Sequence, residues 1–591
     1  MDGNQAAAYA SYAFTEVAGI YPITPSSPMA EYVDEWASKG MKNIFDVPVK
    51  LVEMQSEAGA AGTVHGSLQA GALTTTYTAS QGLLLKIPNM YKIAGELLPG
   101  VIHVSARSLS VQALSIFGDH QDIYATRQTG FTMLASGSVQ EVMDMGTIAH
   151  LTAIKSRVPV LHFFDGFRTS HEIQKIELMD YDVCKRLVDY DAIQAFRDRA
   201  LNPEHPVTRG TAQNDDIYFQ AREAQNKFYD AVPDVAAYYM EEISKETGRE
   251  YKPFKYRGAA DATRILIAMG SICPAAEETV DYLVEKGEKV GLLTVHLYRP
   301  FSEKYFFAVL PKTVEKIAVL ERTKEPGAPG EPLLLDVKGL FYGKDRAPII
   351  VGGRYGLSSK DTTPAQIKAV LDNLKLEHPK TNFTIGIIDD VTFTSLEVGE
   401  RLMVSDPSTK ACLFYGLGAD GTVGANKNSI KIIGDKTDLY AQGYFAYDSK
   451  KSGGVTRSHL RFGKNPIKST YLVSSPSFVA CSVPAYLNQY DMTSGLKEGG
   501  KFLLNCVWDK EEALQRIPNN IKRDLAKANG KLYIINATKL AQEIGLGQRT
   551  NTIMQAAFFK LAEIIPFEEA QQYMKDYAYK SYGKKGDDIV Q

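Results

Sequence analysis

The sequence contains 591 residues, of which 66 are Lys or Arg and 69 are Asp or Glu, so its formal net charge is −3. This near balance, without a long block of like charge, argues against a nucleic-acid arm or a membrane-surface arm. At about 100–200 residues per domain, a chain of this length is expected to hold about three or four domains.

The sequence predicts neither a secretion signal nor a membrane helix. Residues 1–5 have no basic or apolar region, and no apolar run is long enough to span a bilayer. The five cysteines, Cys184, Cys273, Cys412, Cys481 and Cys506, form no CxxC pair. Such spacing fits a reducing compartment better than a disulfide framework. We therefore expect a soluble cytoplasmic protein whose cysteines are ordinary buried residues.

Short apolar runs alternate with helical stretches, which predicts a multidomain α/β fold built on parallel sheets. In a first section, residues 101–105 and 159–164 predict buried strands, and residues 58–72 predict a Gly/Ala-rich helix. The charged and aromatic stretch from about 188 to 257 predicts a helical appendage. A domain boundary is expected near Gly258.

A second section is expected to continue this alternation. Strands are predicted at 264–269, 290–295, 317–320, 348–351 and 383–388. A helix between the first two is expected to end at Lys286, before Gly287. The run Gly-Gly-Arg-Tyr-Gly at 352–356 predicts a turn, with a binding role as the alternative.

A third section, from about Ala411, begins with a predicted strand at 411–415 that leads into a glycine-rich run. Gly416, Gly418 and Gly421 have GxGxxG spacing before a predicted helix, which lets backbone N–H groups approach a phosphate. No acidic residue stands where an NAD ribose would need one. Lys427 and the pair 450–451 favour another phosphate-rich ligand, and a tight turn with solvated lysines is the alternative.

Three side chains of the first section are candidates for chemistry. Thr24 stands between Pro22 and Pro25, which restrict its backbone, and 27–28 resemble an N-cap followed by Pro. The rigid hydroxyl could orient a small anion, or the segment could simply start a helix.

Glu57 begins a stretch of small residues that permits close approach of a flat ligand, and it could share a proton with a ring nitrogen there. Arg107 follows an apolar run, at the carboxyl end of a predicted strand, where a guanidinium suits a carboxylate.

Several segments carry a resemblance to one enzyme family. They are YPITPSS at 21–27, SEAGA at 56–60, SARS at 105–108, SIFGDH at 115–120 and FFDG at 163–166. They resemble the amino-terminal part of pyruvate:ferredoxin (flavodoxin) oxidoreductases, and the likeness continues in order through 416–426 and 443–457. That family decarboxylates pyruvate on thiamine diphosphate and forms acetyl-CoA. Its electrons pass through 4Fe–4S clusters to ferredoxin or flavodoxin.

The resemblance implies roles for the candidate residues. Glu57 would bind the aminopyrimidine of thiamine diphosphate and promote its imino tautomer. Thr24 would hydrogen-bond the substrate beside the reacting carbonyl, and Arg107 would hold the substrate carboxylate. These three are the expected catalytic residues, and Thr24 and Arg107 are also the expected substrate-binding residues.

The resemblance also implies a role for each section. Residues 1–257 would be the pyrimidine-binding domain with its helical appendage, 258–410 a transketolase C-terminal-like domain, and 411–591 a gamma-type domain that binds coenzyme A. The expected coenzyme A residues are Gly421, Thr422, Gly424, Asn426, Lys450, Lys451 and Asn551.

Two expected features of such an enzyme are missing. The sequence has neither cysteine quartets for the clusters nor the GDG…N segment that binds Mg²⁺ and the diphosphate. We therefore expect no metal site on this chain. A cysteine-rich partner chain or a further region would carry Mg²⁺, the diphosphate site and the clusters, and the assembled enzyme is expected to be a dimer.

Two hypotheses follow. The first is a catalytic part of a pyruvate:ferredoxin oxidoreductase, with another 2-oxoacid as the variant. The second is a non-catalytic assembly or coenzyme A-binding module. Thr24, Glu57 and Arg107 together favour the first, because a scaffold has no chemical need for this acid, hydroxyl and guanidinium.

Overall fold

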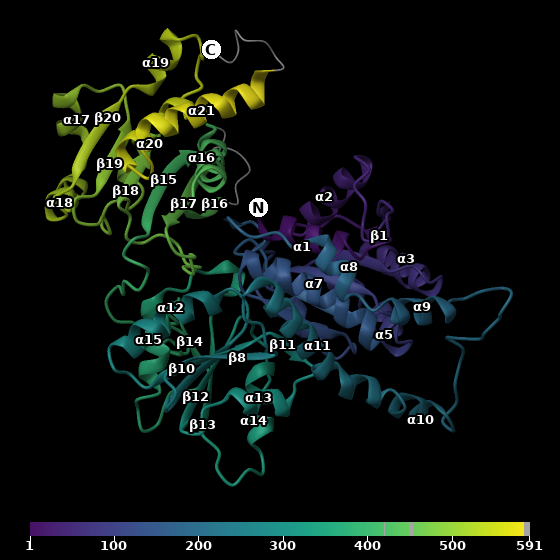
Figure 1. Cartoon of the computed structure of the whole chain (residues 1–591). Coiled ribbons are helices and arrows are strands. Elements are labelled where there is room, and N and C mark those ends of the chain that lie inside the picture. The colour runs from purple at the N-terminus through teal and green to yellow at the C-terminus, as the bar shows by residue number, and fades with distance from the viewer. Residues whose placement is uncertain (419, 448–453, 584–591) are drawn as a thin grey trace. The chain divides into compact units, whose positions relative to one another are not determined.

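The computed structural model describes residues 1–418, 420–447 and 454–583. They form two compact units. The first comprises Met1–His171 and Ile176–Val404, and the second comprises Glu172–Lys175 with the described residues from Ser405 onward. Each unit contains sheets flanked by helices (Figure 1), which confirms the predicted α/β class.

The first unit begins with a largely parallel sheet in the order β11-β5-β6-β4-β3-β1-β2. Its strands are β1 (Val17–Ile20), β2 (Lys50–Glu53), β3 (Thr74–Thr78), β4 (Val101–Ala106), β5 (Thr132–Ser136), β6 (Val160–Asp165) and β11 (Leu297–Arg299). Only the edge strand β11 is antiparallel among these described strands. Every residue of β3 to β6 is buried, as expected for strands covered on both faces.

Two groups of helices pack on this sheet. Helix α1 (Gly3–Tyr12) contacts both α2 (Ser27–Ser38) and α7 (Val139–Ser156), and α11 (Asn226–Thr247) packs on α7. Helices α3 (Glu57–Gln69), α4 (Ser80–Leu85) and α5 (Ile87–Gly95) form the second group. The predicted appendage contains α9 (Tyr190–Asp198), α10 (Tyr218–Glu223) and α11. Its last residues lie in β8 (Phe254–Gly258) of the next sheet.

Three histidines meet in the core beneath α7. His103 Nδ1 lies 2.9 Å from His162 Nδ1, and His103 Nε2 lies 3.0 Å from His150 Nε2. Burial lowers the pKa of His103 to about 3 and the pKa of both neighbours well below the usual value. The three rings are therefore neutral at pH 7 and pack as core residues.

The second sheet of the first unit has the order β14-β13-β12-β9-β10-β8. Its remaining strands are β9 (Arg264–Ala268), β10 (Val290–Val295), β12 (Lys316–Glu321), β13 (Ile349–Arg354) and β14 (Phe383–Thr384). Its helices include α12 (Ile272–Glu285), α14 (Pro332–Phe341) and α15 (Pro364–Asn373). The strands predicted near 264, 290, 317 and 348 are confirmed.

Two predictions for this sheet were wrong. The strand expected at 383–388 ends at Thr384, and Gly352 to Arg354 continue β13 instead of forming a turn. A Cβ on Gly353 would lie 2.0 Å from the Phe383 ring, and one on Gly352 would lie 2.4 Å from Leu334. These glycines therefore serve close packing on the strand rather than a change of chain direction.

The second unit contains a mixed sheet in the order β20-β19-β18-β15-β17-β16-β7. Its strands are β7 (Ile173–Gln174), β15 (Lys410–Leu417), β16 (Tyr440–Tyr447), β17 (Val455–Gly463), β18 (Phe478–Cys481), β19 (Lys501–Asn505) and β20 (Lys531–Ile535). The predicted strand at 411–415 is confirmed within β15.

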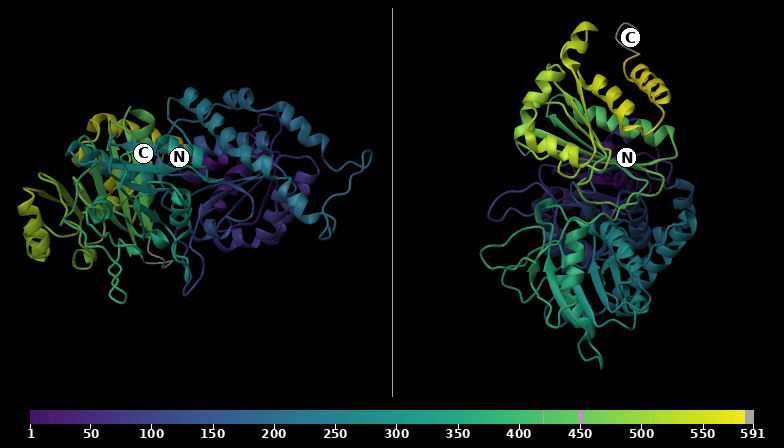
Figure 2. Two further views of the ribbon diagram at one scale, coloured as in Figure 1. Left: turned by 90° about the horizontal axis from the view of Figure 1, so that it is seen from below. Right: turned by 90° about the vertical axis from the view of Figure 1, so that its left-hand side faces the viewer.

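Alternate residues of these strands enter two separate apolar cores, so Phe414 and Leu413 pack on opposite faces. Helices α16 (Thr422–Lys436), α20 (Asn551–Ala562) and α21 (Phe567–Tyr582) cover one face, and α17 (Lys510–Arg516) and α18 (Asn519–Lys527) cover the other. The right-hand view of Figure 2 shows helices on both sides of these strands.

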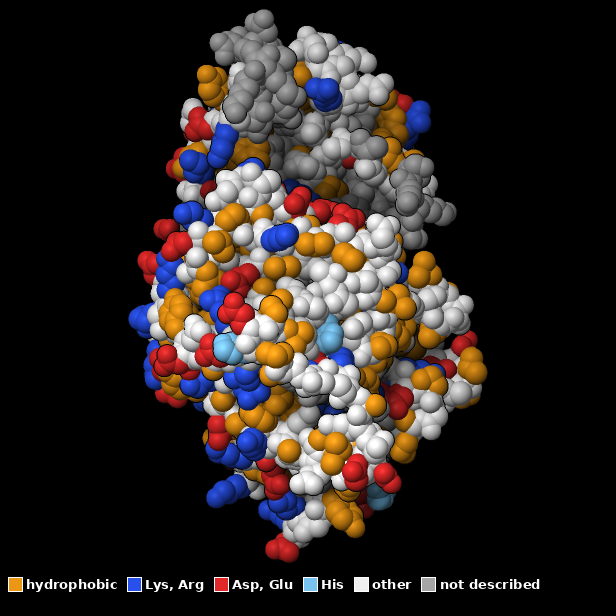
Figure 3. Space-filling view, turned by 90° about the vertical axis from the view of Figure 1, so that its right-hand side faces the viewer, with side chains coloured by type: hydrophobic (Ala, Val, Ile, Leu, Met, Phe, Trp, Pro, Cys, Tyr) orange, Lys and Arg blue, Asp and Glu red, His pale blue; other side chains and the backbone are white. Residues whose placement is uncertain are grey.

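Within the described residues, no helix combines the length and apolar character that crossing a bilayer requires. On the face in Figure 3, basic and acidic side chains are interspersed with apolar ones.

Candidate functional site

The candidate residues of the first unit follow three strands of one parallel sheet. Thr24 follows β1, Glu57 follows β2 and Arg107 follows β4, and the intervening β3 pairs with β1 and β4. Because these strands are parallel, their carboxyl ends meet at one edge, where ligands of α/β sheets bind.

Arg107 and Thr24 are in direct contact. The Arg107 side chain is buried, and its Nη1 donates a hydrogen bond of 2.8 Å to the carbonyl oxygen of Thr24. Its Nε donates to the carbonyl of Ser115 at 3.2 Å. Burial lowers the pKa of Arg107, and the negative charge of Asp122 acts in the opposite direction. Thr24 itself is exposed, so its hydroxyl remains available to a ligand.

The expected helix start after Thr24 is shifted by one residue. Helix α2 has Ser26 as its N-cap, so Ser27 is its first residue and Pro28 its second. Ser26 Oγ donates back to the carbonyl of Ile23 and makes no cap bond to the helix. The prediction of Ser27 as the N-cap was wrong, because proline is also tolerated at the second helical position.

Glu57 is the first residue of α3 and lies against α4. Ser56 caps α3, since its Oγ accepts the N–H of Gly59 at 3.0 Å. A Cβ built on Gly82 of α4 would lie 2.8 Å from Glu57 Cγ and 2.8 Å from Thr78 Oγ1. Gly82 thus provides the space that the partly buried Glu57 side chain occupies.

A buried carboxylate ties the loops of this edge together. Asp122 of α6 (Gln121–Ala125) accepts at Oδ2 from the backbone N–H of Ser80 at 2.7 Å and of Arg107 at 3.0 Å. Its Oδ1 accepts from the N–H of Ile123 at 2.8 Å. Burial raises the pKa of Asp122 to about 8, although these N–H groups favour the ionised form. One side chain therefore fixes both the start of α4 and the backbone of Arg107.

A second buried network joins the two sheets of the first unit. Asp165, at the end of β6, accepts hydrogen bonds from His120, from the backbone N–H of Ser271 at 2.9 Å and from Arg322 Nη1 at 2.6 Å. The His120 N–H donates to the carbonyl of Arg322 at 2.8 Å. The opposite charges hold the pKa of Asp165 below its usual range. The segment SIFGDH at 115–120 therefore contributes His120 to the contact between the two sheets.

The sequence did not single out Gly82 and Asp122 at this edge, or Arg322 in the network between the two sheets. Asp122 follows the GDH motif by two residues, so the motif was the available signal. Gly82 and Arg322 lie in segments whose sequence carries no recognisable motif, so no signal in the sequence pointed to them.

In the second unit, the glycine-rich run forms the start of α16. Gly421 is its N-cap, with a φ of +82°, and a Cβ there would lie 2.9 Å from Asn551 Nδ2. Asp420 accepts the N–H groups of Leu417 and Thr422, each at 2.8 Å. The predicted residues Gly421, Thr422 and Asn551 therefore meet at one helix N-terminus.

Unpaired polar atoms lie buried beside this turn. Asn426 Nδ2, Thr456 Oγ1 and Ser458 Oγ have no hydrogen-bond partner among the described residues. A Cβ on Gly424 would meet nothing within 4 Å, so the helix is open there. The predicted pair Lys450 and Lys451 lies outside the described residues.

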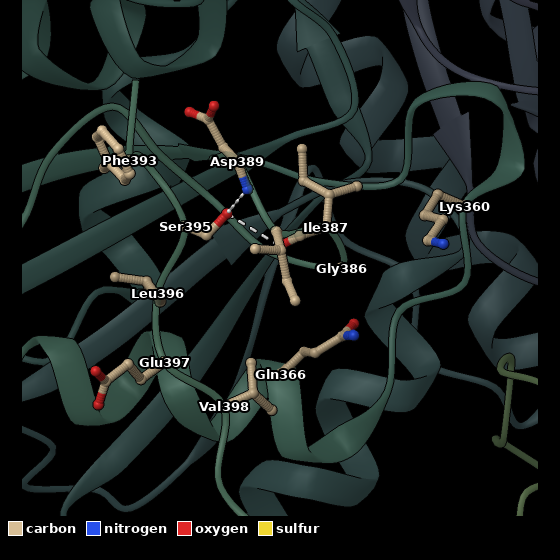
Figure 4. A pocket seen from close by; sticks show the side chains of 11 residues that line it. Lys360, Gln366, Gly386, Ile387, Asp389, Phe393, Ser395, Leu396, Glu397 and Val398 are labelled. Carbon is tan, nitrogen blue, oxygen red and sulfur yellow. Dashed lines mark hydrogen bonds between the residues drawn. The ribbon is translucent and has the colours of Figure 1, made fainter. Parts of the chain in front are cut away.

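A cleft of about 940 Å³ lies elsewhere in the first unit (Figure 4). Its lining comes from Lys360, Gln366 and the loop from Gly386 to Val398. It contains none of Thr24, Glu57 and Arg107, and the charged side chains in it do not converge on a common point. Among the described residues, no three His, Cys, Asp or Glu side chains gather as metal ligands would.

Models of three protein families match the chain. They are "Pyruvate flavodoxin/ferredoxin oxidoreductase, thiamine diP-bdg" at residues 9–241, "Pyruvate:ferredoxin oxidoreductase core domain II" at 262–367 and "Pyruvate ferredoxin/flavodoxin oxidoreductase" at 411–590.

Curated relatives match over the full chain. The pyruvate-flavodoxin oxidoreductase of Enterobacter agglomerans is 63% identical over 591 residues, which cover 100% of this chain and 50% of that protein. The pyruvate:ferredoxin oxidoreductase of Moorella thermoacetica is 62% identical over 590 residues, with the same shares. The chain therefore spans about half the length of these relatives. A solved 2-oxoglutarate:ferredoxin oxidoreductase from Magnetococcus marinus aligns with 18% identity and a TM-score of 0.46 over 64% of each chain.

The contact between Gly82 and Glu57 yields a prediction. We expect Gly82→Ala to reduce the free energy of unfolding by about 1–3 kcal/mol, because the added methyl group displaces Glu57 or Thr78. Gly62→Ala on α3 is the matched control, since a Cβ there meets nothing within 4 Å. It should be neutral or stabilising by up to about 1 kcal/mol through helix propensity. Urea unfolding measures both, and equal effects would contradict the close packing.

Proposed function

Because this chain belongs to the pyruvate flavodoxin/ferredoxin oxidoreductase family, we propose that it forms the pyrimidine side of the thiamine diphosphate site of a pyruvate:ferredoxin oxidoreductase, together with its coenzyme A-binding region. The carrying observation is the edge of the first sheet, where Arg107 contacts Thr24 and Glu57 begins the neighbouring helix α3.

The reaction converts pyruvate and coenzyme A to acetyl-CoA, CO₂, one proton and two electrons. Thiamine diphosphate supplies a nucleophilic carbon and an electron sink for loss of CO₂. Glu57 exchanges a proton with a ring nitrogen of the aminopyrimidine. The fit rests on the partly buried carboxyl of Glu57 at the open edge and on the small residues around it, Gly59 and Gly82.

Arg107 and Thr24 bind the substrate in this proposal. Arg107 Nε and Nη1 are held by backbone carbonyls, whereas Nη2 makes no hydrogen bond within the described residues. A fixed guanidinium with a free N–H presents a directed donor to the pyruvate carboxylate. The exposed Thr24 hydroxyl, next to it, hydrogen-bonds the substrate beside the reacting carbonyl.

The second unit binds coenzyme A. The N-terminus of α16 offers backbone N–H groups and a positive helix end to a phosphate. The unpaired amide of Asn426 and the side chain of Asn551 add donors beside it. Lys450 and Lys451 complete the proposed coenzyme A residues, because their positive charges suit its phosphates.

The remaining parts of the reaction belong to a complementary region. We assign Mg²⁺, the diphosphate site and the 4Fe–4S clusters to that region or partner chain, because the sequence has neither cysteine quartets nor the GDG…N segment. The curated relatives are twice as long as this chain, which leaves room for such a region. Electrons then pass to ferredoxin or flavodoxin, and the assembled enzyme is a cytoplasmic dimer.

Glu57→Gln tests the proposal. The change keeps the side-chain volume but removes the proton exchange, so hydrogen–deuterium exchange at thiamine C2 should slow by orders of magnitude in the assembled enzyme. Glu53→Gln is the matched control, because Glu53 is an exposed acid four residues earlier. Unchanged exchange in Glu57→Gln would remove Glu57 from the mechanism.

Gly421→Ala tests the coenzyme A site. An alanine at a φ of +82° is strained and its Cβ meets Asn551, so calorimetric titration should show coenzyme A binding weakened at least about tenfold. Gly434→Ala, farther along α16, has only one distant neighbour and should bind normally. Tighter binding of NAD than of coenzyme A by the wild-type chain would instead identify a dinucleotide site.

A further inference from the structure

A buried lysine lies behind Glu57. Lys86 links α4 to α5, and only 1% of the residue is exposed. Its Nζ donates a hydrogen bond of 3.2 Å to the carbonyl oxygen of Glu57. It makes no other hydrogen bond among the described residues, although an ammonium group carries three donors.

This position is unfavourable for a cation on structural grounds alone. Lysine is rarely fully buried without a paired charge, and the N-terminal end of α3 is the positive end of its dipole. Burial lowers the pKa of Lys86 to about 8, and the charge of Glu57 acts in the opposite direction. A methionine of similar length would fill the same space without the cost of desolvating a charge.

Glu57 is the feature that accounts for a cation here. The other charged groups on neighbouring elements already have partners. Asp122 of α6 accepts backbone N–H groups, and Arg107 binds backbone carbonyls. On the facing sides of α3 and α5, Glu96 is shared by His65 and Lys92. The remaining interaction of Lys86 is with the first residue of α3.

We propose that Lys86 is a positioning residue that places a fixed positive charge beside Glu57 and holds the first turn of α3, an inference that rests on the role of Glu57 proposed above. The hydrogen bond fixes the Glu57 backbone, and Gly82 leaves room for its side chain. The ammonium ion stabilises the ionised form of Glu57 in its proton exchange with the aminopyrimidine.

The first test measures unfolding of this chain alone in urea, without any cofactor. Between pH 8 and 10.5 the unfolded chain holds a proton on Lys86 that the folded chain has lost, so the contribution of Lys86 to stability rises with pH across this window and is constant and unfavourable below it. Lys86→Met should therefore unfold at an equal or higher urea concentration than wild type at pH 7, and this advantage should shrink by pH 10.

The matched control for this test is Lys92→Met, on the exposed side of α5. Its urea unfolding midpoint relative to wild type should be the same at pH 7 and at pH 10. If Lys86→Met is less stable than wild type by the same amount at every pH, Lys86 is a structural residue and the proposal is wrong.

The second test measures C2 exchange against pH in the enzyme assembled with its complementary region. In Lys86→Met the pH of half-maximal exchange should rise by about one unit, because an opposite charge near the carboxylate is lost. Lys86→Arg should restore the wild-type profile.

The Glu57→Gln variant separates this inference from the proposed function. If Glu57→Gln itself exchanges normally, the proposed function fails. If Glu57→Gln is slow while the Lys86→Met and wild-type profiles coincide, only the inference about Lys86 fails.

Discussion

Parallel pairing of β2, β1, β3 and β4 is the constraint on which the proposed site depends. It brings residues that are up to 83 positions apart, Thr24 and Arg107, to one sheet edge. The pairing alone leaves the loops free to vary. Asp122 removes that freedom, because one buried carboxylate accepts the N–H groups of both Ser80 and Arg107. The start of α4, which packs on α3, and the backbone of Arg107 are therefore fixed relative to each other.

The edge contains charged groups whose burial is costly, as functional sites often do. Asp122 and Lys86 both have pKa values moved to about 8 by burial, in opposite directions. An apolar residue in place of Lys86 would avoid the cost of desolvating a charge. Asp122 is different, because it satisfies three backbone N–H groups that an apolar residue would leave unpaired. By contrast, the buried carboxylate of Asp165 accepts hydrogen bonds from both His120 and Arg322 and joins the two sheets of the first unit. Asp122 thus fixes the loops at the edge, and Asp165 links the two sheets behind it.

Much of the first unit could be predicted from sequence, because its strands are short apolar runs between helical stretches. Thr24 could be singled out by its flanking prolines, Glu57 by the small residues that follow it, and Arg107 by the apolar run before it. Their partners could not. Gly82 matters only because α4 packs on α3, and Lys86 reads as a surface residue until that packing buries it. The meeting of His103, His150 and His162 likewise depends on how α7 crosses β4 and β6. The glycines at 352 and 353 predict a turn locally, but their neighbours Leu334 and Phe383 place them in a strand.

The central claim is that this chain provides one side of a shared catalytic site. Pyruvate-dependent reduction of ferredoxin or a redox dye, measured anaerobically with thiamine diphosphate, Mg²⁺ and coenzyme A, tests it most directly. The assay compares this chain alone, the complementary region alone and the two combined. The account predicts reduction only in the combined sample. Pyruvate-dependent reduction by this chain alone, or a brown protein with stoichiometric iron after anaerobic purification, would contradict it.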